Sequence, residues 1–342
     1  MKLTLFMPGL GWLDGHDGAE VCKGLALPAL SLLLGRGQLT RQTCTLSERK
    51  ASLLPAGDAS PASRFAAQCE LDPSANWLLA DPVHLRIDRD RALLADVGVM
   101  RLSQTEADQL LCSLNHHFAE DGLRFHAPRP DRWLLSLPTP AGAAFTPLQD
   151  AVGENVNQHL PRGEDGLRWS RLLNEMQMLL YTHPVNDERE SRGELAVNSV
   201  WLWGQQAARS SLPIHGGWQT VLTDDDDAQQ AALRGGLDAD AAPYAYVGLA
   251  EAGLGNRNVL VEVDALLAAA QYRDAWGWRE ALQRLEADWF APLLAALKRG
   301  EVSELTLITH GSAGFTLSLT PAMLWRFWRR PLGLPALYTD LE

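Results

Sequence analysis

Short apolar runs alternate with helical patterns at both ends of the chain. Residues 3–7 (LTLFM) form an apolar run, and residues 25–37 (LALPALSLLLGRG) follow with a helical pattern that ends in glycines. In the last third, residues 258–264 (NVLVEVD) and 305–309 (LTLIT) flank a long helical pattern at 272–300. This alternation is typical of α/β proteins. It predicts one mostly parallel sheet that is built from both chain ends.

The middle of the chain shows a different order of patterns. Strand-like and helix-like segments follow one another as β-α-β-β-α-β at residues 77–88, 103–118, 123–127, 132–138, 167–181 and 195–204. This order is that of a ferredoxin-like unit. Residues 76–210 are therefore predicted to form an α+β domain, inserted into an α/β domain made of residues 1–75 and 211–342. Residues 38–76 are interpreted as loop and short helix.

Composition and charge limit the classes of partner. The chain has 342 residues, of which 46% are hydrophobic, so it can bury a large core. Its net charge of −12 repels nucleic acid and anionic lipid. The four cysteines lack zinc spacing, no apolar stretch is long enough to cross a bilayer, and the N-terminus lacks the layout of a signal peptide. We expect a cytoplasmic protein with neither a nucleic-acid nor a membrane partner.

The C-terminal segment 324–331 (LWRFWRRP) mixes aromatic residues with arginine. Thr320 as N-cap and Pro321 at the first helical position predict a short closing helix. We expect its tryptophans to pack on the sheet rather than to contact a membrane or nucleic acid.

Three segments, in this order, resemble the archaeal-type cofactor-independent phosphoglycerate mutases of the alkaline phosphatase superfamily. Residues 8–15 (PGLGWLDG), with the helix after them, resemble that family's first strand end, DGLGD. Residues 183–204 (HPVNDERESRGELAVNSVWLWG) resemble its segment HPVN..R...G..AN..LLRG. Residues 259–297 with 305–314 (LTLITHGSAG) resemble its late strand, its helix and the strand carrying SDHG. The resemblance implies an alkaline-phosphatase-like α/β core with an inserted α+β domain.

A narrower resemblance rests on residues 77–90 (WLLADPVHLRIDRD), 174–180 (NEMQMLL) and 198–204 (NSVWLWG). These segments are similar to a bacterial group of the same lineage, labelled as regulatory proteins of the RpfE type. That likeness implies a regulatory role.

The resemblance also implies a centre of two divalent cations (Mn, Zn or Mg) that activates a Ser or Thr nucleophile. This chain has Pro8 and Thr309 where that family has Asp ligands, and keeps His310. Asp264 is a further metal candidate, although no His follows it at a useful distance. The nucleophile segment has a loose counterpart at residues 57–63, where Ser60 or Ser63 is the candidate. Without a full ligand set, we expect no cofactor, and a divalent metal only if the protein is active.

Asp14, His16 and Asp17 offer an alternative, displaced metal site near the expected cleft. An acidic helix start with an exposed histidine explains the same pattern and is the favoured interpretation.

The segment 182–193 (THPVNDERESRG) holds the best-preserved match to the mutase pattern. His183, Asn186 and Arg189 match HPVN..R position by position, and an Arg can grip phosphate or carboxylate through two parallel hydrogen bonds. The alternative is that the segment ends a helix and forms a polar turn. With the resemblance, the two interpretations are evenly balanced.

These observations predict a catalytically degenerate phosphoglycerate-mutase-like protein with a regulatory or phospho-ligand-binding role. The expected ligand is a small phosphorylated or carboxylated metabolite, bound through His183, Asn186 and Arg189. Two alternatives stay open: an active metal-dependent phosphoglycerate mutase or phosphatase with relocated ligands, and a protein-interaction module with a protein partner.

Overall fold

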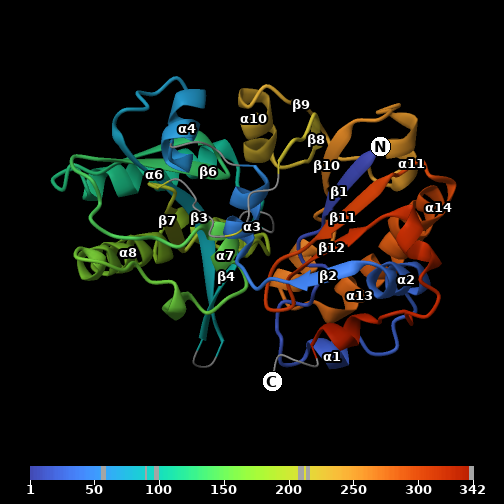
Figure 1. Cartoon of the computed structure of the whole chain (residues 1–342). Coiled ribbons are helices and arrows are strands. Elements are labelled where there is room, and N and C mark those ends of the chain that lie inside the picture. Colours follow the sequence, from blue (N-terminus) through green and yellow to red (C-terminus); the bar gives the residue numbers. More distant parts are fainter. Residues whose placement is uncertain (55–58, 89–90, 96–99, 207–211, 213–215, 339–342) are drawn as a thin grey trace. The chain divides into compact units, whose positions relative to one another are not determined.

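The computed structural model describes residues 1–54, 59–88, 91–95, 100–206, 212 and 216–338 (Figure 1). The chain folds into two compact units. The first unit consists of Met1–Pro55 with Arg209–Glu342, and the second consists of Ala56–Ala208. The prediction placed residues 56–75 in the first unit. They lie in the second because Ala62 N donates to Gly204 O at 2.9 Å, which ties the helix that begins there to the second unit's last strand. The predicted boundary at residue 211 lies outside the described residues.

The first unit contains a mostly parallel sheet in the order β2-β12-β11-β1-β10-β8-β9. Its strands are β1 (Lys2–Phe6), β2 (Gln38–Arg41), β8 (Thr220–Leu222), β9 (Asp238–Asp240), β10 (Asn258–Glu262), β11 (Glu304–Ile308) and β12 (Phe315–Leu319). β1 pairs in parallel with both β10 and β11, so segments from the two chain ends form its centre (Figure 1). The predicted α/β class and the sheet built from both ends are confirmed. The pairs β11–β12 and β12–β2 are antiparallel.

Helices cover both faces of this sheet. They are α1 (Gly18–Val21), α2 (Pro28–Arg36), α3 (Leu46–Leu53), α10 (Asp226–Arg234), α11 (Tyr246–Glu251), α12 (Leu267–Gln271), α13 (Ala275–Leu285), α14 (Ala291–Arg299) and the 3₁₀ turns η3 (Pro321–Trp325) and η4 (Leu334–Leu337). Successive strand residues face opposite sides. Leu3 and Leu5 of β1 therefore pack with α2, α13 and α14, while Phe6 packs with α3 and α10.

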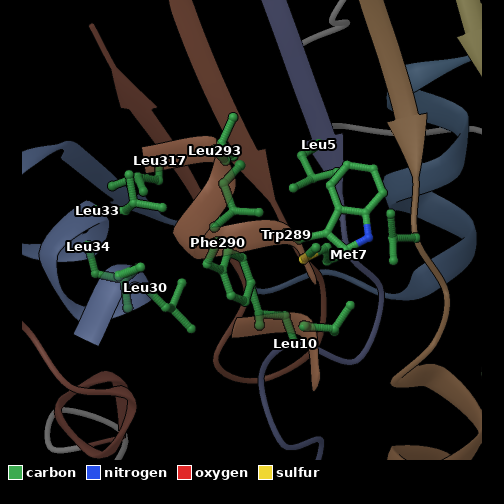
Figure 2. Packing of buried hydrophobic residues seen from close by; sticks show 14 of the residues in the cluster. Leu5, Met7, Leu10, Leu30, Leu33, Leu34, Trp289, Phe290, Leu293 and Leu317 are labelled. Atoms are coloured by element: carbon green, nitrogen blue, oxygen red, sulfur yellow. The ribbon is translucent and has the colours of Figure 1, made fainter. Parts of the chain in front are cut away.

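The core beneath β1 depends on an interruption in the long C-terminal helix. Between α13 and α14 lies a π-helical turn, η2 (Glu286–Phe290). Pro292 follows within the next turn. It has no N–H to donate to the carbonyl four residues earlier, and its ring would clash with that carbonyl in a regular α-helix. The turn places Trp289 and Phe290 among Leu5, Met7 and Leu10 (Figure 2). It also buries Glu286, whose carboxylate accepts from the N–H groups of Ala29 and Leu30 at the start of α2.

The second unit has a sheet in the order β4-β3-β6-β5, with β7 also paired to β3. Its strands are β3 (Asn76–Asp88), β4 (Arg91–Ala95), β5 (Arg124–Arg129), β6 (Arg132–Leu137) and β7 (Ser199–Trp203). Its helices are α4 (Pro61–Gln68), α6 (Gln104–His117), α7 (Leu148–Ala151), η1 (Val156–Gln158), α8 (Gly166–Tyr181) and α9 (Pro184–Ser191). The order β7-β3-β6-β5 is antiparallel throughout and fits the predicted ferredoxin-like unit, to which β4 and several short helices are added.

Two sequence interpretations need correction. The segment read as loop and short helix before residue 77 also contains the edge strand β2, whose polar residues gave no alternating signal. The aromatic side chains near the C-terminus do not pack on the sheet: Trp325, Phe327 and Trp328 are each at least 69% exposed. They follow a single 3₁₀ turn, and its N-cap Thr320 makes no side-chain capping bond. None of the described helices is long and apolar enough to cross a bilayer.

Candidate functional site

The carboxyl ends of three neighbouring strands meet at one edge of the first unit's sheet. Phe6, the last residue of β1, pairs in register with Glu262 of β10 and Ile308 of β11. The segments that begin at Met7, Val263 and Thr309 therefore leave the sheet side by side. Ligands of open α/β sheets bind beyond the carboxyl ends of the strands. This edge is where chemistry is expected.

A set of polar residues gathers at this edge, and we refer to it as the strand-end cluster. Its members come from the strand ends and from the facing helix α3: Arg49, Lys50, Thr223, Asp225, Glu262, Thr309 and His310. The isolated bridge between Cys44 and Gly311 brings the start of α3 beside the end of β11.

Two carboxylates of the cluster follow the neighbouring strands β8 and β10. Glu262 ends β10 and is buried, and its Oε2 accepts from Thr223 Oγ1 at 2.7 Å. Asp225 is the N-cap of α10, where its Oδ1 accepts from Ala228 N at 3.0 Å. Each carboxylate thus has one oxygen that accepts a hydrogen bond from Thr223 or Ala228, while its other oxygen faces a different partner.

Lys50 occupies the space between these two carboxylates. Its Nζ contacts Asp225 Oδ2 and lies 3.0 Å from Glu262 Oε1. Burial by itself lowers the pKa of Lys50, but the carboxylates of Glu262 and Asp225 outweigh it and hold that pKa above its ordinary value. The ammonium is therefore charged at neutral pH and permanently paired.

Arg49, the preceding residue, is buried completely and only partly bonded. Its Nη1 donates to Gln42 Oε1 at 3.1 Å. Its Nε and Nη2 are buried and find no acceptor within the described part of the chain. A buried charged group with unused N–H donors is costly unless an acceptor joins it.

Thr309 and His310 add two more unused polar atoms. Thr309 Oγ1 and His310 Nδ1 are buried without a hydrogen-bond partner among the described residues. Burial, helped by the positive charges of Lys50 and Arg49, lowers the pKa of His310 to about 3. The imidazole is thus neutral at physiological pH. The cluster offers donors and positive charge, as an anion requires.

A pocket opens on the other side of Glu262. Its volume is about 280 Å³, and its polar lining comes from Asp224, Glu262, Asp264, Arg284 and Asp288. Asp264, a metal candidate from the sequence, is exposed here and lies two residues beyond the buried strand end. The buried carboxylate of β10 is Glu262 instead.

The two-metal centre implied by the resemblance does not fit these residues. Pro8 and Thr309 supply no carboxylate, and the two carboxylates that are present hold Lys50. Within the described ranges, no group of three or more His, Cys, Asp or Glu side chains is arranged to hold a metal ion. This includes Asp14, His16 and Asp17, which are all exposed. Asp14 Oδ1 accepts from His16 N, and Asp17 Oδ1 accepts from Trp12 Nε1, so both carboxylates stabilise the local turn.

The nucleophile candidates Ser60 and Ser63 lie in the second unit, at the start of α4. Ser60 is the N-cap: its Oγ accepts from Ser63 N and donates to Ser63 Oγ, both at 3.0 Å. Both residues line an open depression of about 460 Å³ with Arg64 and Gln205. The Ser60 hydroxyl thus caps α4, and the Ser63 hydroxyl is bonded to it.

The segment with the best match to the mutase pattern forms α9, and two of its polar side chains, Asn186 and Arg189, are buried. Asn186 is buried: its Nδ2 donates to Leu180 O and Val197 O, and its Oδ1 accepts from Val197 N. His183 caps α9 by accepting from Val185 N, and its Nε2 lies 3.0 Å from Ser113 Oγ. Burial lowers the pKa of His183 below its ordinary value.

Arg189 is fully buried and fully engaged. Its Nε donates to Leu195 O at 2.9 Å, Nη1 donates to Glu106 Oε2 at 3.1 Å, and Nη2 donates to Met100 O. The ligand-binding role predicted for Asn186 and Arg189 needs polar atoms that are free to bond a ligand, whereas the polar atoms of these two side chains are already bonded within the protein. In this segment, the residues that match the mutase pattern stabilise the fold of the second unit.

Glu106 joins this framework to the capping box of α6. Its carboxylate accepts from Ser103 N and from the guanidinium groups of Arg189 and Arg192. Burial alone would raise the pKa of Glu106, but the bonds from Ser103 and the two arginines lower it to about 2. We refer to Glu106, His183, Asn186, Arg189 and Arg192 as the α9 cluster.

Sequence reasoning missed most of the strand-end cluster. One signal was available for Glu262, a charged residue that ends an apolar strand, and another for Asp225, the capping position of an acidic helix start. Arg49 and Lys50 gave no signal, because α3 was read as part of a loop-rich segment.

Comparisons with known proteins agree with the resemblance over part of the chain. No protein-family model matches it. The 2,3-bisphosphoglycerate-independent phosphoglycerate mutase of Methanosarcina mazei is 29% identical over 188 residues, covering 52% of this chain and 47% of that protein. The enzyme of the same name from Methanosarcina acetivorans is 30% identical over 176 residues, covering 49% of this chain and 44% of that protein.

A solved structure, the cofactor-independent phosphoglycerate mutase from Thermoplasma acidophilum, is 17% identical and aligns over 94% of this chain and 90% of that one, with a TM-score of 0.42. The chain spans about half the length of the curated relatives it matches. It is thus similar in sequence, over about half its length, to 2,3-bisphosphoglycerate-independent phosphoglycerate mutases.

Proposed function

We propose that this chain is a catalytically degenerate phosphoglycerate-mutase-like protein that binds a small phosphorylated or carboxylated metabolite and does not convert it. The proposed binding site is the strand-end cluster, and the proposed role is regulatory, in keeping with the likeness to proteins of the RpfE type. One observation carries the proposal: the buried guanidinium of Arg49 has two nitrogens without an acceptor among the residues that the structure describes.

An anion would satisfy the unused donors of this cluster. A phosphate or carboxylate accepts two parallel hydrogen bonds from a guanidinium, and such charge-assisted bonds are stronger than neutral ones. The Thr309 hydroxyl can add a third donor. His310 is neutral, so one of its ring nitrogens can donate without adding charge.

Turnover is not expected, because no group of His, Cys, Asp or Glu side chains among the described residues is arranged to hold the metal that would activate a nucleophile. Asp225 and Glu262 are paired with Lys50, Ser60 serves as a helix cap, and the Ser63 hydroxyl accepts a hydrogen bond from Ser60. An active metal-dependent phosphoglycerate mutase or phosphatase is the alternative, and it would need a metal that binds despite Lys50.

Calorimetric titration of 3-phosphoglycerate and of inorganic phosphate tests the binding proposal. We expect saturable binding of 3-phosphoglycerate to the unaltered protein, and at least a tenfold weaker affinity in Arg49→Met. Arg234→Gln is the matched control, because Arg234 is exposed in the same unit. Equal affinity in Arg49→Met would place the ligand elsewhere, and no binding of either anion by the unaltered protein would refute the proposal.

A second role, as a protein-interaction module, is favoured by one observation. Trp325, Phe327 and Trp328 are exposed within four residues of one another. Clusters of exposed aromatics mark interaction surfaces. Light scattering with a candidate partner, before and after Trp325→Ser and Trp328→Ser, tests this role. A partner that binds both forms equally would exclude these side chains as the interface.

A further inference from the structure

We infer that Lys50 is a resident cation that takes the place of a divalent metal ion between Asp225 and Glu262. The chain would thereby keep the electrostatics of a metal site without needing the metal. This inference goes beyond the proposed function, since it holds whether or not a metabolite binds.

The arrangement of the two carboxylates is that of a cation site. They follow neighbouring parallel strands, β8 and β10, which pair in register through Leu222 and Val261. One oxygen of each carboxylate is fixed by the framework, through Thr223 Oγ1 and Ala228 N, and the other oxygen of each contacts Lys50 Nζ. Hard divalent cations bind carboxylate oxygens of this kind.

The pair of carboxylates needs a cation for its own stability. The Glu262 side chain is 9% exposed and that of Asp225 is 30% exposed, so water screens their repulsion only in part. Two like charges that share a partly buried site repel one another unless a counter-charge lies between them. Lys50 supplies that charge from α3, and its own side chain is 22% exposed.

Arg49, the neighbour of Lys50, contributes a second positive charge at this site. Arg49 and Lys50 together carry the formal charge of one divalent ion, and both act on His310. Arg49 keeps unused donors, whereas Lys50 is fully paired with acids. Lys50 would therefore neutralise the carboxylates, and Arg49 would face the anion, the two tasks that a metal performs at once in a phosphoryl-transfer site.

The inference makes an unusual prediction: removing Lys50 should create a metal site. Mn²⁺ is titrated into metal-free protein and followed by electron paramagnetic resonance of the free ion. Lys50→Ala should bind one Mn²⁺ at least tenfold more tightly than the unaltered protein, and Mn²⁺ should raise its Tm. Lys298→Ala, which removes an exposed lysine of the same unit, should behave like the unaltered protein.

A double variant identifies the ligands. Lys50→Ala combined with Glu262→Gln should lose the gained affinity, because one of the two carboxylates is gone. No gain in Lys50→Ala, or a gain that survives Glu262→Gln, overturns the inference.

The unaltered protein gives an independent test if Lys50→Ala does not fold. If Lys50 occupies the site, we expect no saturable binding of Mn²⁺ at concentrations below about 0.1 mM, where only the weakest protein sites for divalent cations are still empty. Tight binding of Mn²⁺ by the unaltered protein would overturn the inference. The 3-phosphoglycerate titration is done in EDTA, so failure of anion binding and failure of the Lys50 inference give separate results.

Discussion

The strand-end cluster and the α9 cluster each bury an arginine, but the two arginines differ in what they still lack. Every nitrogen of Arg189 in the α9 cluster has an internal acceptor. Arg49 in the strand-end cluster has two nitrogens without an acceptor in the described parts of the chain. A protein that has satisfied a buried charge uses it as structure, whereas an unsatisfied buried charge costs stability and indicates a ligand. The candidate site therefore lies at Arg49 and Lys50, which the sequence did not single out, and not at Arg189, where the sequence match is best.

The largest expected effect is on the α9 cluster. Arg189→Ala should lower the free energy of unfolding by about 3–5 kcal/mol, because it leaves Glu106 and two carbonyl groups without their buried partner. Urea denaturation of the purified variant measures this loss. Arg192→Ala is the matched control: Arg192 is half exposed and bonds the same Glu106, so a much smaller loss is expected than for Arg189→Ala. A small loss in Arg189→Ala would mean that the side chain is free to serve a ligand.

The next effect is a pH dependence that arises in the strand-end cluster. His310 has its pKa lowered to about 3 in the folded protein, so between pH 6.5 and pH 3 the unfolded chain binds a proton that the folded chain does not. Stability should therefore fall as the pH drops through this window, by at most about 1.4 kcal/mol per pH unit from this one group. Above pH 6.5 the group contributes no slope.

His310→Gln checks this assignment. The variant should lose part of the acid slope between pH 6.5 and pH 4 in urea denaturation series and match the unaltered protein's slope above pH 7. An unchanged acid slope would show that His310 is protonated, or accessible, in the folded state.

Arg49→Met should leave the free energy of unfolding unchanged or raise it, whereas Arg189→Ala should lower it. Replacing a buried, partly unpaired charge with an apolar side chain is neutral or stabilises by about 1–2 kcal/mol. Thermal denaturation measures the change, and the same preparation should have lost 3-phosphoglycerate binding. A strong loss of stability would show that Arg49, like Arg189, belongs to the framework.

The smallest effect is expected at the helix cap of the second unit. Ser60→Ala should cost about 1 kcal/mol, because a capping acceptor for Ser63 N is lost. It should leave 3-phosphoglycerate affinity unchanged. A loss of turnover in this variant, if the protein turned over phosphoglycerate at all, would restore Ser60 as a nucleophile.

The sequence predicted the sheet of the first unit because its strands are uninterrupted apolar runs, as in β1 and β10. The start of α6 also follows from its sequence, because Ser103 and Glu106 have the spacing of a capping box, and both of its bonds are present in the structure. The edge strand β2 was missed because its residues are mostly exposed and polar, so they show no apolar pattern. A short helix was expected in residues 38–76, but α3 could not be placed there because its buried positions include Arg49 and Ser47, which a hydrophobic pattern does not register.

The candidate site was the hardest part to predict. Sequence similarity to the mutase pattern drew attention to Arg189, yet similarity does not separate a buried framework residue from a ligand-binding one. Lys50, Asp225 and Glu262 are far apart in the sequence. The pairing of β8 with β10 brings the two carboxylates close together, and α3 places Lys50 against both. The pairing of charges, which decides the chemistry, is a property of the folded edge.

The most direct test of the central claim is a ³¹P NMR experiment on one sample. The protein is mixed with 3-phosphoglycerate in EDTA, and excess Mg²⁺ and Zn²⁺ are then added. The account predicts a shifted or broadened 3-phosphoglycerate resonance already in EDTA, and no 2-phosphoglycerate resonance after the metals are added. A resonance that changes only with metal, followed by the appearance of 2-phosphoglycerate, would contradict it.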